Sequence, residues 1–212
     1  VAYDNGRSGF DIGVGATVTA CAAYDNGITG FSAGSGSALM GCSAYGNGGN
    51  GFSIGSSSTA TGCSAYSNVG NGISAGTGST VSACSVRSNA QNGLNVFEYC
   101  TITGNTAANN NVGIRVFGDN NAIQSNTCGG NDIGVFVTSH ANRIDGNTCT
   151  NNGVSFDIDG VDNLVIRNSA TGGVPNYAIV AGNSVAPRVS VTDSDGWAGI
   201  SNANHPWANL GY

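Results

Sequence analysis

The stretch from Asn47 to Ile54 is Asn-Gly-Gly-Asn-Gly-Phe-Ser-Ile, and it returns 21 residues later as Asn-Val-Gly-Asn-Gly-Ile-Ser-Ala from Asn68 to Ala75. In each copy a turn rich in glycine and asparagine leads into a short segment where apolar residues alternate with small or polar ones. That alternation is the period of a β-strand with one buried face. The repeat therefore predicts the fold better than any single motif does.

The interval of 21 residues extends through most of the chain, in several parallel columns that chance does not produce. One column is asparagine throughout: Asn5, Asn26, Asn47, Asn68, Asn89, Asn110, Asn131 and Asn152. Another column is apolar: Val18, Leu39, Ala60, Val81, Ile102, Ile123, Ile144 and Val165. A third column changes from cysteine to asparagine: Cys21, Cys42, Cys63, Cys84, Asn105, Asn126, Asn147 and Asn168.

A repeat of this length, made of short strands and turns, cannot close a core alone and must stack on its neighbours. We therefore expect an all-β parallel solenoid of about nine coils over residues 1–182, with three strands per coil and almost no helix. One residue is deleted before the strand pattern resumes at Gly113. Stacking in register brings like residues together, so the column asparagines are expected to hydrogen-bond along a ladder.

The composition excludes several classes of protein. Of the 212 residues, 8% are charged, and the formal net charge is −6, with six arginines and no lysine. A nucleic-acid-binding protein needs a basic face, so nucleic acid is not an expected partner. No apolar stretch is long enough to span a membrane. Disordered chains are richer in charge and poorer in valine, isoleucine and cysteine than this one.

Six of the seven cysteines fall into stacked pairs, one coil apart, and can be joined or free. The pairs are Cys21 with Cys42, Cys63 with Cys84, and Cys128 with Cys149. A spacing of about 4.8 Å between coils lies inside the Cα range of disulfides. Three disulfides along the axis and a row of buried free thiols are therefore alternatives. Cys100 stands outside both columns, and no cysteine–histidine cluster suggests zinc.

Tyr3, Tyr24, Tyr45 and Tyr66 occupy one column, which Arg87 continues, and this column is expected to face solvent. Stacked tyrosines could bind sugar rings, pack against a second solenoid, or only stiffen one face. A flat face of small residues with threonines, such as Thr17 and Thr59, would also suit close packing between filaments. It resembles an ice-binding surface only faintly.

The ends of the chain lead to a further expectation. Val1 falls in the middle of a coil, with no basic and apolar leader before it, so the first coil is expected to be an open end or to follow coils that are absent. An open end exposes unpaired strand edges. Residues 183–212 leave the period and hold Trp197 and Trp207. They are expected to cap or line the solenoid, or to dock into the open end of another copy.

The pattern Ile-x-x-Asn-x-Ala/Cys-x-x-Asn-x-x-Gly-Ile-x-Val, seen from Ile102 to Val116 with local adjustments of spacing, resembles right-handed parallel β-helix proteins of the pectate-lyase-like superfamily. The resemblance covers about residues 1–182, and the chain is most similar to secreted bacterial members whose function is unknown. It implies a right-handed solenoid. It leaves the activity open, because the superfamily contains polysaccharide lyases, glycoside hydrolases, epimerases and non-enzymatic surface proteins.

An enzyme of this superfamily would draw on the second half of the chain. Asp157 and Asp159 share one strand face, Asp162 follows, and Arg115 lies two coils away. The resemblance implies a lyase in which these aspartates hold Ca²⁺ and the arginine is the base; otherwise no cofactor is expected. The coils carry almost no inserted loops, however, and such loops form the cleft walls in enzymes of this fold.

We therefore expect a secreted, non-catalytic solenoid, located outside a bacterial cell or on its surface. It would be a structural, self-assembling rod, end-to-end or side-by-side, or it would display a glycan-binding face. The alternative is a polysaccharide lyase or glycoside hydrolase.

Overall fold

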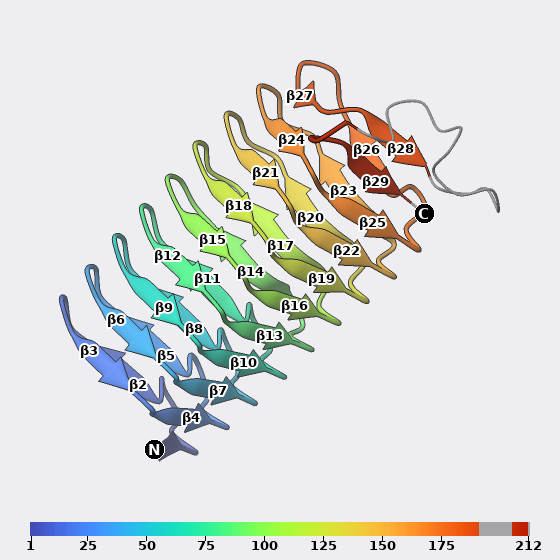
Figure 1. Cartoon of the computed structure of the whole chain (residues 1–212). Helices are drawn as coiled ribbons and strands as arrows, with labels where there is room; N and C mark the ends of the chain where they lie inside the picture. Colours follow the sequence, from blue (N-terminus) through green and yellow to red (C-terminus); the bar gives the residue numbers. More distant parts are fainter. Residues whose placement is uncertain (191–204, 212) are drawn as a thin grey trace.

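The structure is a computed structural model that describes residues 1–190 and 205–211. The chain winds into a β-solenoid, and each coil adds one strand to each of three parallel sheets (Figure 1). Sheet A contains eleven strands, whereas sheets B and C contain nine each. No helix occurs in the described ranges, and so none there is long and apolar enough to cross a membrane. The predicted all-β solenoid of about nine coils is confirmed.

The strands are short and follow one another around the coil in the order A, B, C. Sheet A consists of β1 (Ala2–Tyr3), β4 (Ala22–Tyr24), β7 (Ser43–Tyr45), β10 (Ser64–Tyr66), β13 (Ser85–Arg87), β16 (Thr106–Ala108), β19 (Thr127–Gly129), β22 (Thr148–Thr150), β25 (Ser169–Thr171), β29 (Asn209–Gly211) and β28 (Arg188–Ser190). Sheet B consists of β2 (Phe10–Ile12), β5 (Phe31–Ala33), β8 (Phe52–Ile54), β11 (Ile73–Ala75), β14 (Asn92–Val96), β17 (Val112–Val116), β20 (Ile133–Val137), β23 (Val154–Ile158) and β26 (Tyr177–Ile179). Sheet C consists of β3 (Thr17–Thr19), β6 (Ala38–Met40), β9 (Thr59–Thr61), β12 (Thr80–Ser82), β15 (Thr101–Thr103), β18 (Ala122–Gln124), β21 (Arg143–Asp145), β24 (Leu164–Ile166) and β27 (Ser184–Val185).

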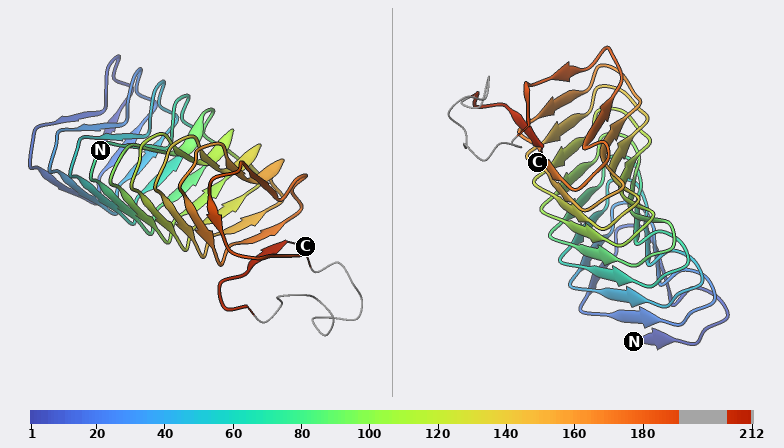
Figure 2. Two further views of the ribbon diagram at one scale, coloured as in Figure 1. Left: turned by 90° about the horizontal axis from the view of Figure 1, so that it is seen from above. Right: turned by 90° about the vertical axis from the view of Figure 1, so that its right-hand side faces the viewer.

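The register follows the sequence repeat. Ser53 pairs with Ser74, and Leu39 pairs with Ala60, so residues 21 apart lie side by side on successive coils. The deletion is absorbed in the turn before β17, because Leu94 still pairs with Ile114. Viewed from above, the coils superpose as nearly parallel loops (Figure 2). Rows of identical side chains therefore become lines along the solenoid, as the repeat predicts.

The core is a narrow column of apolar side chains that point inward from all three sheets. Sheet B supplies the bulky ones, and Phe31 and Phe52 stack with their ring centroids 4.8 Å apart. Sheet A supplies mainly alanine, as at Ala44 and Ala65, which leaves room for those rings. Burying this column against neighbouring coils is the main apolar stabilisation of the fold.

Ladders of buried asparagine side chains hydrogen-bond one turn of the solenoid to the turns of the neighbouring coils. The Nδ2 of Asn47 donates to the Oδ1 of Asn68 at 2.9 Å and to the carbonyl oxygen of Ala23 at 3.2 Å. The backbone N–H of Asn47 donates to the same Oδ1 at 3.1 Å. Each amide is thus satisfied by the coils above and below it, which is what a buried polar group requires. The ladder predicted from Asn5 to Asn152 is confirmed.

Two further turns carry ladders that begin with smaller residues. The cysteine column passes into asparagine where the N–H of Cys84 donates to the Oδ1 of Asn105 at 2.9 Å. Cys100 belongs to a third column, which the sequence analysis did not recognise. This column consists of Ser37, Ser58, Ser79, Cys100, Asn121, Asn142, Asn163 and Asn183. The thiols of these two columns, from Cys21 to Cys84 and at Cys100, therefore hold the same places that asparagine holds in later coils.

All seven cysteines are free in the structure. Cys21 is half-buried, and the other six are buried. The thiols of Cys42, Cys63, Cys84 and Cys100 lie close to backbone carbonyl oxygens; for example, the Sγ of Cys63 is 3.5 Å from the oxygen of Leu39. Three disulfides along the axis stay a prediction that intact mass with and without reductant tests.

The C-terminal segment returns to the last coil. β29 lies between β25 and β28 in sheet A, and Asn209 accepts from Asn168 at the next rung of its ladder. In the described part, the segment therefore covers the sheet A end of the solenoid, next to the strand edge that β25 would otherwise expose (Figure 1). Trp197 lies outside the described residues, whereas Trp207 lies just before β29.

Candidate functional site

The outer face of sheet B changes character halfway along the solenoid. Its first four strands span three residues each, whereas β14, β17, β20 and β23 span five. The outward row carries Ser53 and Ser74 in the first half and then Asn95, Arg115, Phe136 and Asp157. Of these, Arg115 and Asp157 are residues that the sequence analysis singled out. Longer strands and larger side chains thus appear on the same coils.

Arg115 is packed between aromatic rings. Its guanidinium carbon lies 4.3 Å from the centre of the Phe117 ring and 5.2 Å from that of Phe136. Cations over aromatic faces at such distances are attracted by the ring quadrupole. Phe97 and Phe117 are each 44% exposed, and their rings are 6.4 Å apart. We call Phe97, Arg115, Phe117 and Phe136 the sheet B patch.

The sheet B patch borders a small polar hollow of about 210 Å³. Gln91, Asn92 and Asn111 line it together with Arg115 and Ala90. Arg115 Nε is buried and is the one buried side-chain nitrogen or oxygen without a hydrogen-bond partner in the described ranges. The hollow therefore presents amides and a guanidinium beside exposed rings. Donors with few protein partners, set against an apolar surface, are typical of a ligand-binding site.

The predicted aspartates lie at the other end of this face. Asp157 is half-buried on β23, and burial raises the pKa of its carboxyl above the ordinary value, with Asp159 raising that pKa further. Phe136 lies between Asp157 and Arg115 in the row, and the structure has no ion pair between those two charges. The structure thus brings Asp157 and Asp159 together and keeps Arg115 two strands away.

Of the three aspartates predicted to hold Ca²⁺ if it binds, Asp157 lies on β23, and Asp159 and Asp162 follow its end. Among the described residues, no group of three or more histidine, cysteine, aspartate or glutamate side chains is placed to hold a metal ion. Asp162 lies in an exposed turn with φ at 59°, after the end of β23. Asp157, Asp159 and Asp162, the predicted ligands if Ca²⁺ is bound, are not among such groups in the described residues.

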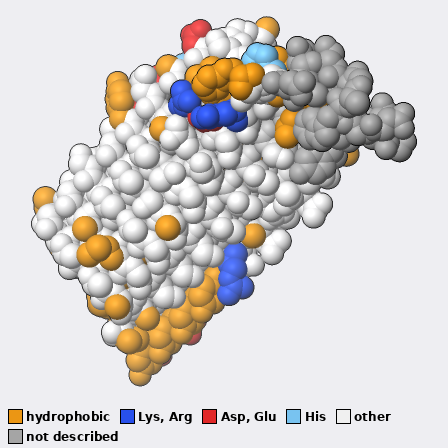
Figure 3. Space-filling view, in the orientation of Figure 1, with side chains coloured by type: hydrophobic (Ala, Val, Ile, Leu, Met, Phe, Trp, Pro, Cys, Tyr) orange, Lys and Arg blue, Asp and Glu red, His pale blue; other side chains and the backbone are white. Residues whose placement is uncertain are grey.

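The tyrosine column forms the expected stack. Its ring centroids are 5.2, 4.8 and 4.9 Å apart, and the rings are parallel to within 7°. Arg87 continues it, with its guanidinium carbon 4.9 Å from the centre of the Tyr66 ring. Figure 3 shows a stripe of hydrophobic side chains on these first coils with a cationic side chain at its end. Because each inner ring covers its neighbour's face, solvent meets mainly ring edges and hydroxyl groups.

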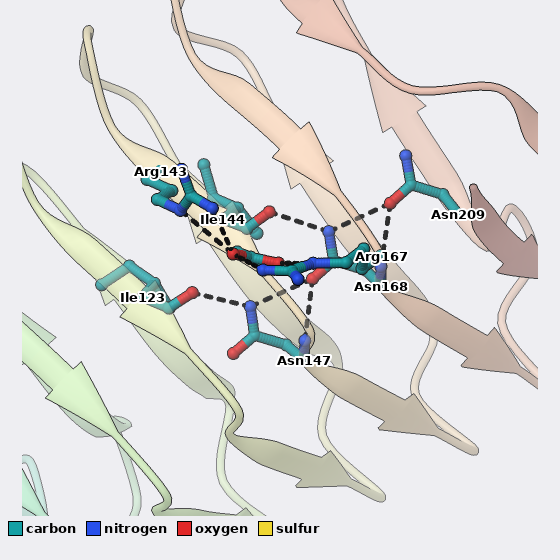
Figure 4. A network of polar contacts seen from close by, with 8 residues as sticks. Ile123, Arg143, Ile144, Asn147, Arg167, Asn168 and Asn209 are labelled. Carbon is teal, nitrogen blue, oxygen red and sulfur yellow. Dashed lines mark hydrogen bonds and ion pairs between the residues drawn. The ribbon is translucent and has the colours of Figure 1, made fainter. Parts of the chain in front are cut away.

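A second polar cluster was missed by the sequence analysis. Asp145, on β21, is almost fully buried and accepts hydrogen bonds from both Arg143 and Arg167 (Figure 4). Trp207 completes the cluster, with its ring centre 5.1 Å from the guanidinium carbon of Arg167. Asp145 and Arg167 are 22 residues apart and Trp207 lies off the repeat, so comparison at intervals of 21 does not pair them. Acidic and basic residues in successive coils were the one available signal.

Comparison with known proteins identifies the fold family. The family described as the right-handed β-helix region matches residues 1–101 and 57–194. No curated protein sequence matches the chain. Among solved structures, the A-modules of two mannuronan C-5 epimerases from Azotobacter vinelandii superpose with TM-scores of 0.74 and 0.67, at 20% and 19% identity. A pectate lyase superposes with a TM-score of 0.53 at 16% identity.

The overlap with these structures is partial. The chain is covered to 87% by both epimerase modules and to 74% by the lyase, but it spans only 62%, 59% and 51% of their respective lengths. At these identities the likeness shows a shared fold alone. The family match, in contrast, extends over most of the chain and agrees with the three parallel sheets and the stacked asparagines. The chain therefore belongs to the right-handed β-helix family.

Proposed function

We propose that this protein binds a polysaccharide chain across the outer face of sheet B, and that it does so without catalysis. The observation that carries the proposal is the sheet B patch, where the rings of Phe117 and Phe136 flank the guanidinium of Arg115. Phe97 and Phe117 are each 44% exposed on this face. An extended sugar polymer offers hydroxyl or carboxylate oxygens to the guanidinium and apolar ring faces to the phenyl rings. The structural neighbours that act on mannuronan and pectate support polysaccharide as the ligand class.

The arrangement of charges favours binding over chemistry. Arg115 and Asp157 are separated by Phe136 in the row, so they do not form an acid–base pair across one sugar bond. In the described coils, turns of a few residues join each sheet B strand to the sheet A strand before it and the sheet C strand after it. No long loop therefore rises beside the patch in these coils, and the patch lies on an open face. General acid–base catalysis requires both groups within hydrogen-bond reach of one bond, in a shielded site.

Affinity electrophoresis tests the proposal. The protein is run through native gels that contain polygalacturonate, alginate or a neutral cellulose derivative, with Arg115→Gln and Phe117→Ala as variants. Arg7→Gln, at an exposed turn of the first coil, is the matched control. We expect at least one polymer to retard the wild type and the control, and to retard the two variants much less. Equal retardation of all four proteins, or none, would contradict the proposal.

A polysaccharide lyase or glycoside hydrolase is the second candidate, and the aspartates favour it. Burial, and then Asp159, raises the pKa of Asp157, and carboxyl groups with perturbed pKa values are more frequent at catalytic sites than elsewhere. Incubation with pectate and alginate, with and without Ca²⁺, would then yield new unsaturated products or shorter chains. Their loss in Asp157→Asn, with folding unchanged, would replace the binding proposal by this one.

The proposed ligand also suggests where the protein acts, and self-association is proposed beside it. Polymers of this kind are met outside the cell, so we propose an extracellular or cell-surface protein. Self-association along the solenoid axis or through the tyrosine column belongs to the same proposal. Sedimentation velocity at rising concentration tests it: a constant sedimentation coefficient of a monomer would exclude self-association over that range.

A further inference from the structure

The outer face of sheet C breaks its own repeat near the C-terminal end of the solenoid. Its outward rows carry mainly threonine, serine and alanine over the first coils, as at Thr59, Thr80 and Thr101, with Met40 and Gln124 as larger exceptions. Strand β21 then places Arg143 and Asp145 in these rows, and β24 places Leu164 and Ile166 there. Small side chains thus give way to two charged and two apolar ones in consecutive coils, at the place where Trp207 arrives.

Asp145 fixes the two arginines. Arg143 donates through Nε at 3.0 Å and through Nη2 at 2.7 Å to Oδ2, and Arg167 donates through Nε at 2.7 Å to Oδ1 and through Nη2 to Oδ2. The side chain of Asp145 is 4% exposed, whereas those of Arg143 and Arg167 are 40% and 47% exposed. A buried carboxylate therefore holds two half-exposed guanidinium groups in place. We call these three residues the arginine clamp.

The arginine clamp carries surplus positive charge and surplus donors. Two guanidinium groups share one carboxylate, so the clamp has a net charge of about +1 in a chain of net charge −6. Each guanidinium has five N–H donors, and neither Nη1 has a partner in the part of the chain that the structure describes. Such donors suit a planar oxyanion, because guanidinium pairs with carboxylate through parallel hydrogen bonds.

An apolar pocket adjoins the arginine clamp and shares Arg143 with it. The pocket has a volume of about 460 Å³ and is lined by Leu164, Ile166, Val185 and Trp207, with His205 also in the lining. The polar hollow on the other side of Arg143, of about 400 Å³, is lined by Arg143, Asp145, Arg167 and Gln124. Figure 3 shows cationic side chains next to hydrophobic ones at this end of the molecule. A ligand here meets an indole and aliphatic surface beside fixed cationic donors.

We propose that the arginine clamp and the Trp207 pocket form a second binding site, for a sugar ring that carries a carboxylate. The carboxylate would lie on the free donors of Arg143 and Arg167, and the ring would lie against the indole and the aliphatic lining. If this site and the sheet B patch bind the same polymer, that polymer contains uronic acid residues. This choice of sugar rests on the proposed function. Its donors and its pocket do not depend on the sheet B patch.

The indole N–H signal of Trp207 in NMR spectra reports on this site, with Trp197→Phe used to assign it. The probes are sodium D-glucuronate, D-glucose and sodium sulfate. We expect a saturable shift with glucuronate, and at least a tenfold weaker response to glucose and to sulfate. Arg143→Gln, which leaves Arg167 on Asp145, should weaken glucuronate binding at least tenfold, whereas Arg143→Lys should retain part of it. Arg7→Gln, at an exposed turn of the first coil, is the control and should bind as the wild type does.

Failure of the second binding site can be distinguished from failure of the proposed function. No saturable shift, an equal response to glucose, or an unchanged affinity in Arg143→Gln would overturn the second site. An equal response to sulfate would reduce it to a general oxyanion site and overturn the sugar-ring part. Glucuronate binding should survive Arg115→Gln. If it does while no polymer retards the protein, the second site stands and the sheet B proposal fails.

Discussion

At the scale of single residues, the buried side chains of the turns are the most constrained groups in the molecule. The Oδ1 of Asn68 accepts from both the N–H and the Nδ2 of Asn47, and its Nδ2 donates to Ala44 and Asn89. No other side chain provides both an acceptor and a donor at that distance from the backbone, since aspartate lacks the donor and glutamine is longer. Geometry therefore explains why asparagine persists at this turn through eight coils.

Replacing Asn68 with alanine tests the ladder. The change leaves the Asn47 amides and the carbonyl oxygen of Ala44 buried without their partners, and each such group costs about 1–3 kcal/mol. We expect the free energy of unfolding in urea to fall by about 2–4 kcal/mol. Asn111→Ala makes the same change at an exposed position and should cost less than about 0.5 kcal/mol. Equal effects of the two substitutions would contradict a structural role of the ladder.

The thiols provide a second prediction at this scale. Burial raises the pKa of Cys42, Cys100 and Cys149, so these groups stay protonated and shielded at neutral pH. We expect iodoacetamide to alkylate only Cys21 quickly in the folded protein and all seven cysteines after denaturation, as counted by intact mass. A mass that rises upon reduction alone would show that the paired cysteines are joined by disulfides.

The acid stability of the arginine clamp is a third prediction. The hydrogen bond from Arg167, and then that from Arg143, lowers the pKa of Asp145 below its ordinary value. A carboxyl with a lower pKa in the folded state stabilises that state above the unfolded pKa of about 4, and the stabilisation is lost as pH falls through the folded pKa. Asp145→Asn should therefore cost about 1–3 kcal/mol at pH 7 and progressively less below pH 4. Exposed Asp132→Asn is the control, and a cost for Asp145→Asn that is independent of pH would contradict the ion pair.

At the scale of the elements, the entry into a sheet B strand is glycine in the first seven coils, from Gly9 to Gly134, and becomes Ser155 and Asn176 in the last two. A Cβ on Gly72 would lie 2.6 Å from the carbonyl oxygen of Gly93 and 2.8 Å from the Nδ2 of Asn89. Both contacts are shorter than van der Waals distance, and both atoms are fixed by the next coil. The close approach of two coils thus explains the glycine at position 72.

Gly72→Ala should consequently disturb the stacking of β11 on β14. We expect a loss of about 1–3 kcal/mol in the free energy of unfolding, as for other substitutions that overfill a packed site. Gly13→Ala is the matched control, because a Cβ there would meet nothing within 4 Å. A thermal melting temperature that falls as much for Gly13→Ala as for Gly72→Ala would show that close approach is not the cause.

Prediction from the sequence succeeded for most positions that the repeat determines, although it missed the column from Ser37 to Asn183, and it was limited elsewhere. Columns at intervals of 21 residues placed the strands, the Asn47 ladder and the tyrosine stack, because parallel pairing in register makes such residues neighbours. The arginine clamp joins Asp145 to Arg167 in a turn with φ at 55°, and the column comparison cannot detect that contact. The position of Arg115 over Phe117 depends on side-chain rotamers, which periodicity does not specify.

At the scale of the whole molecule, the three surfaces described above lie on three different sheets and on different coils. Sheet A carries the tyrosine column over the first coils, sheet B carries the patch over the middle coils, and sheet C carries the arginine clamp near the last coils. The fold provides a rigid support on which each row of outward side chains can change without loss of the core. A polysaccharide bound across sheet B would therefore meet a preformed surface.

NMR titration of the backbone amides with oligosaccharides from a polymer that retards the protein is the most direct test of that surface. We expect the largest shifts on the outward row of β14, β17 and β20, around Asn95, Arg115 and Phe136, with a smaller second group at Arg143 and Arg167. Arg115→Gln should remove the first group and leave the second. Shifts confined to the tyrosine column, or spread evenly over all three sheets, would contradict binding across sheet B.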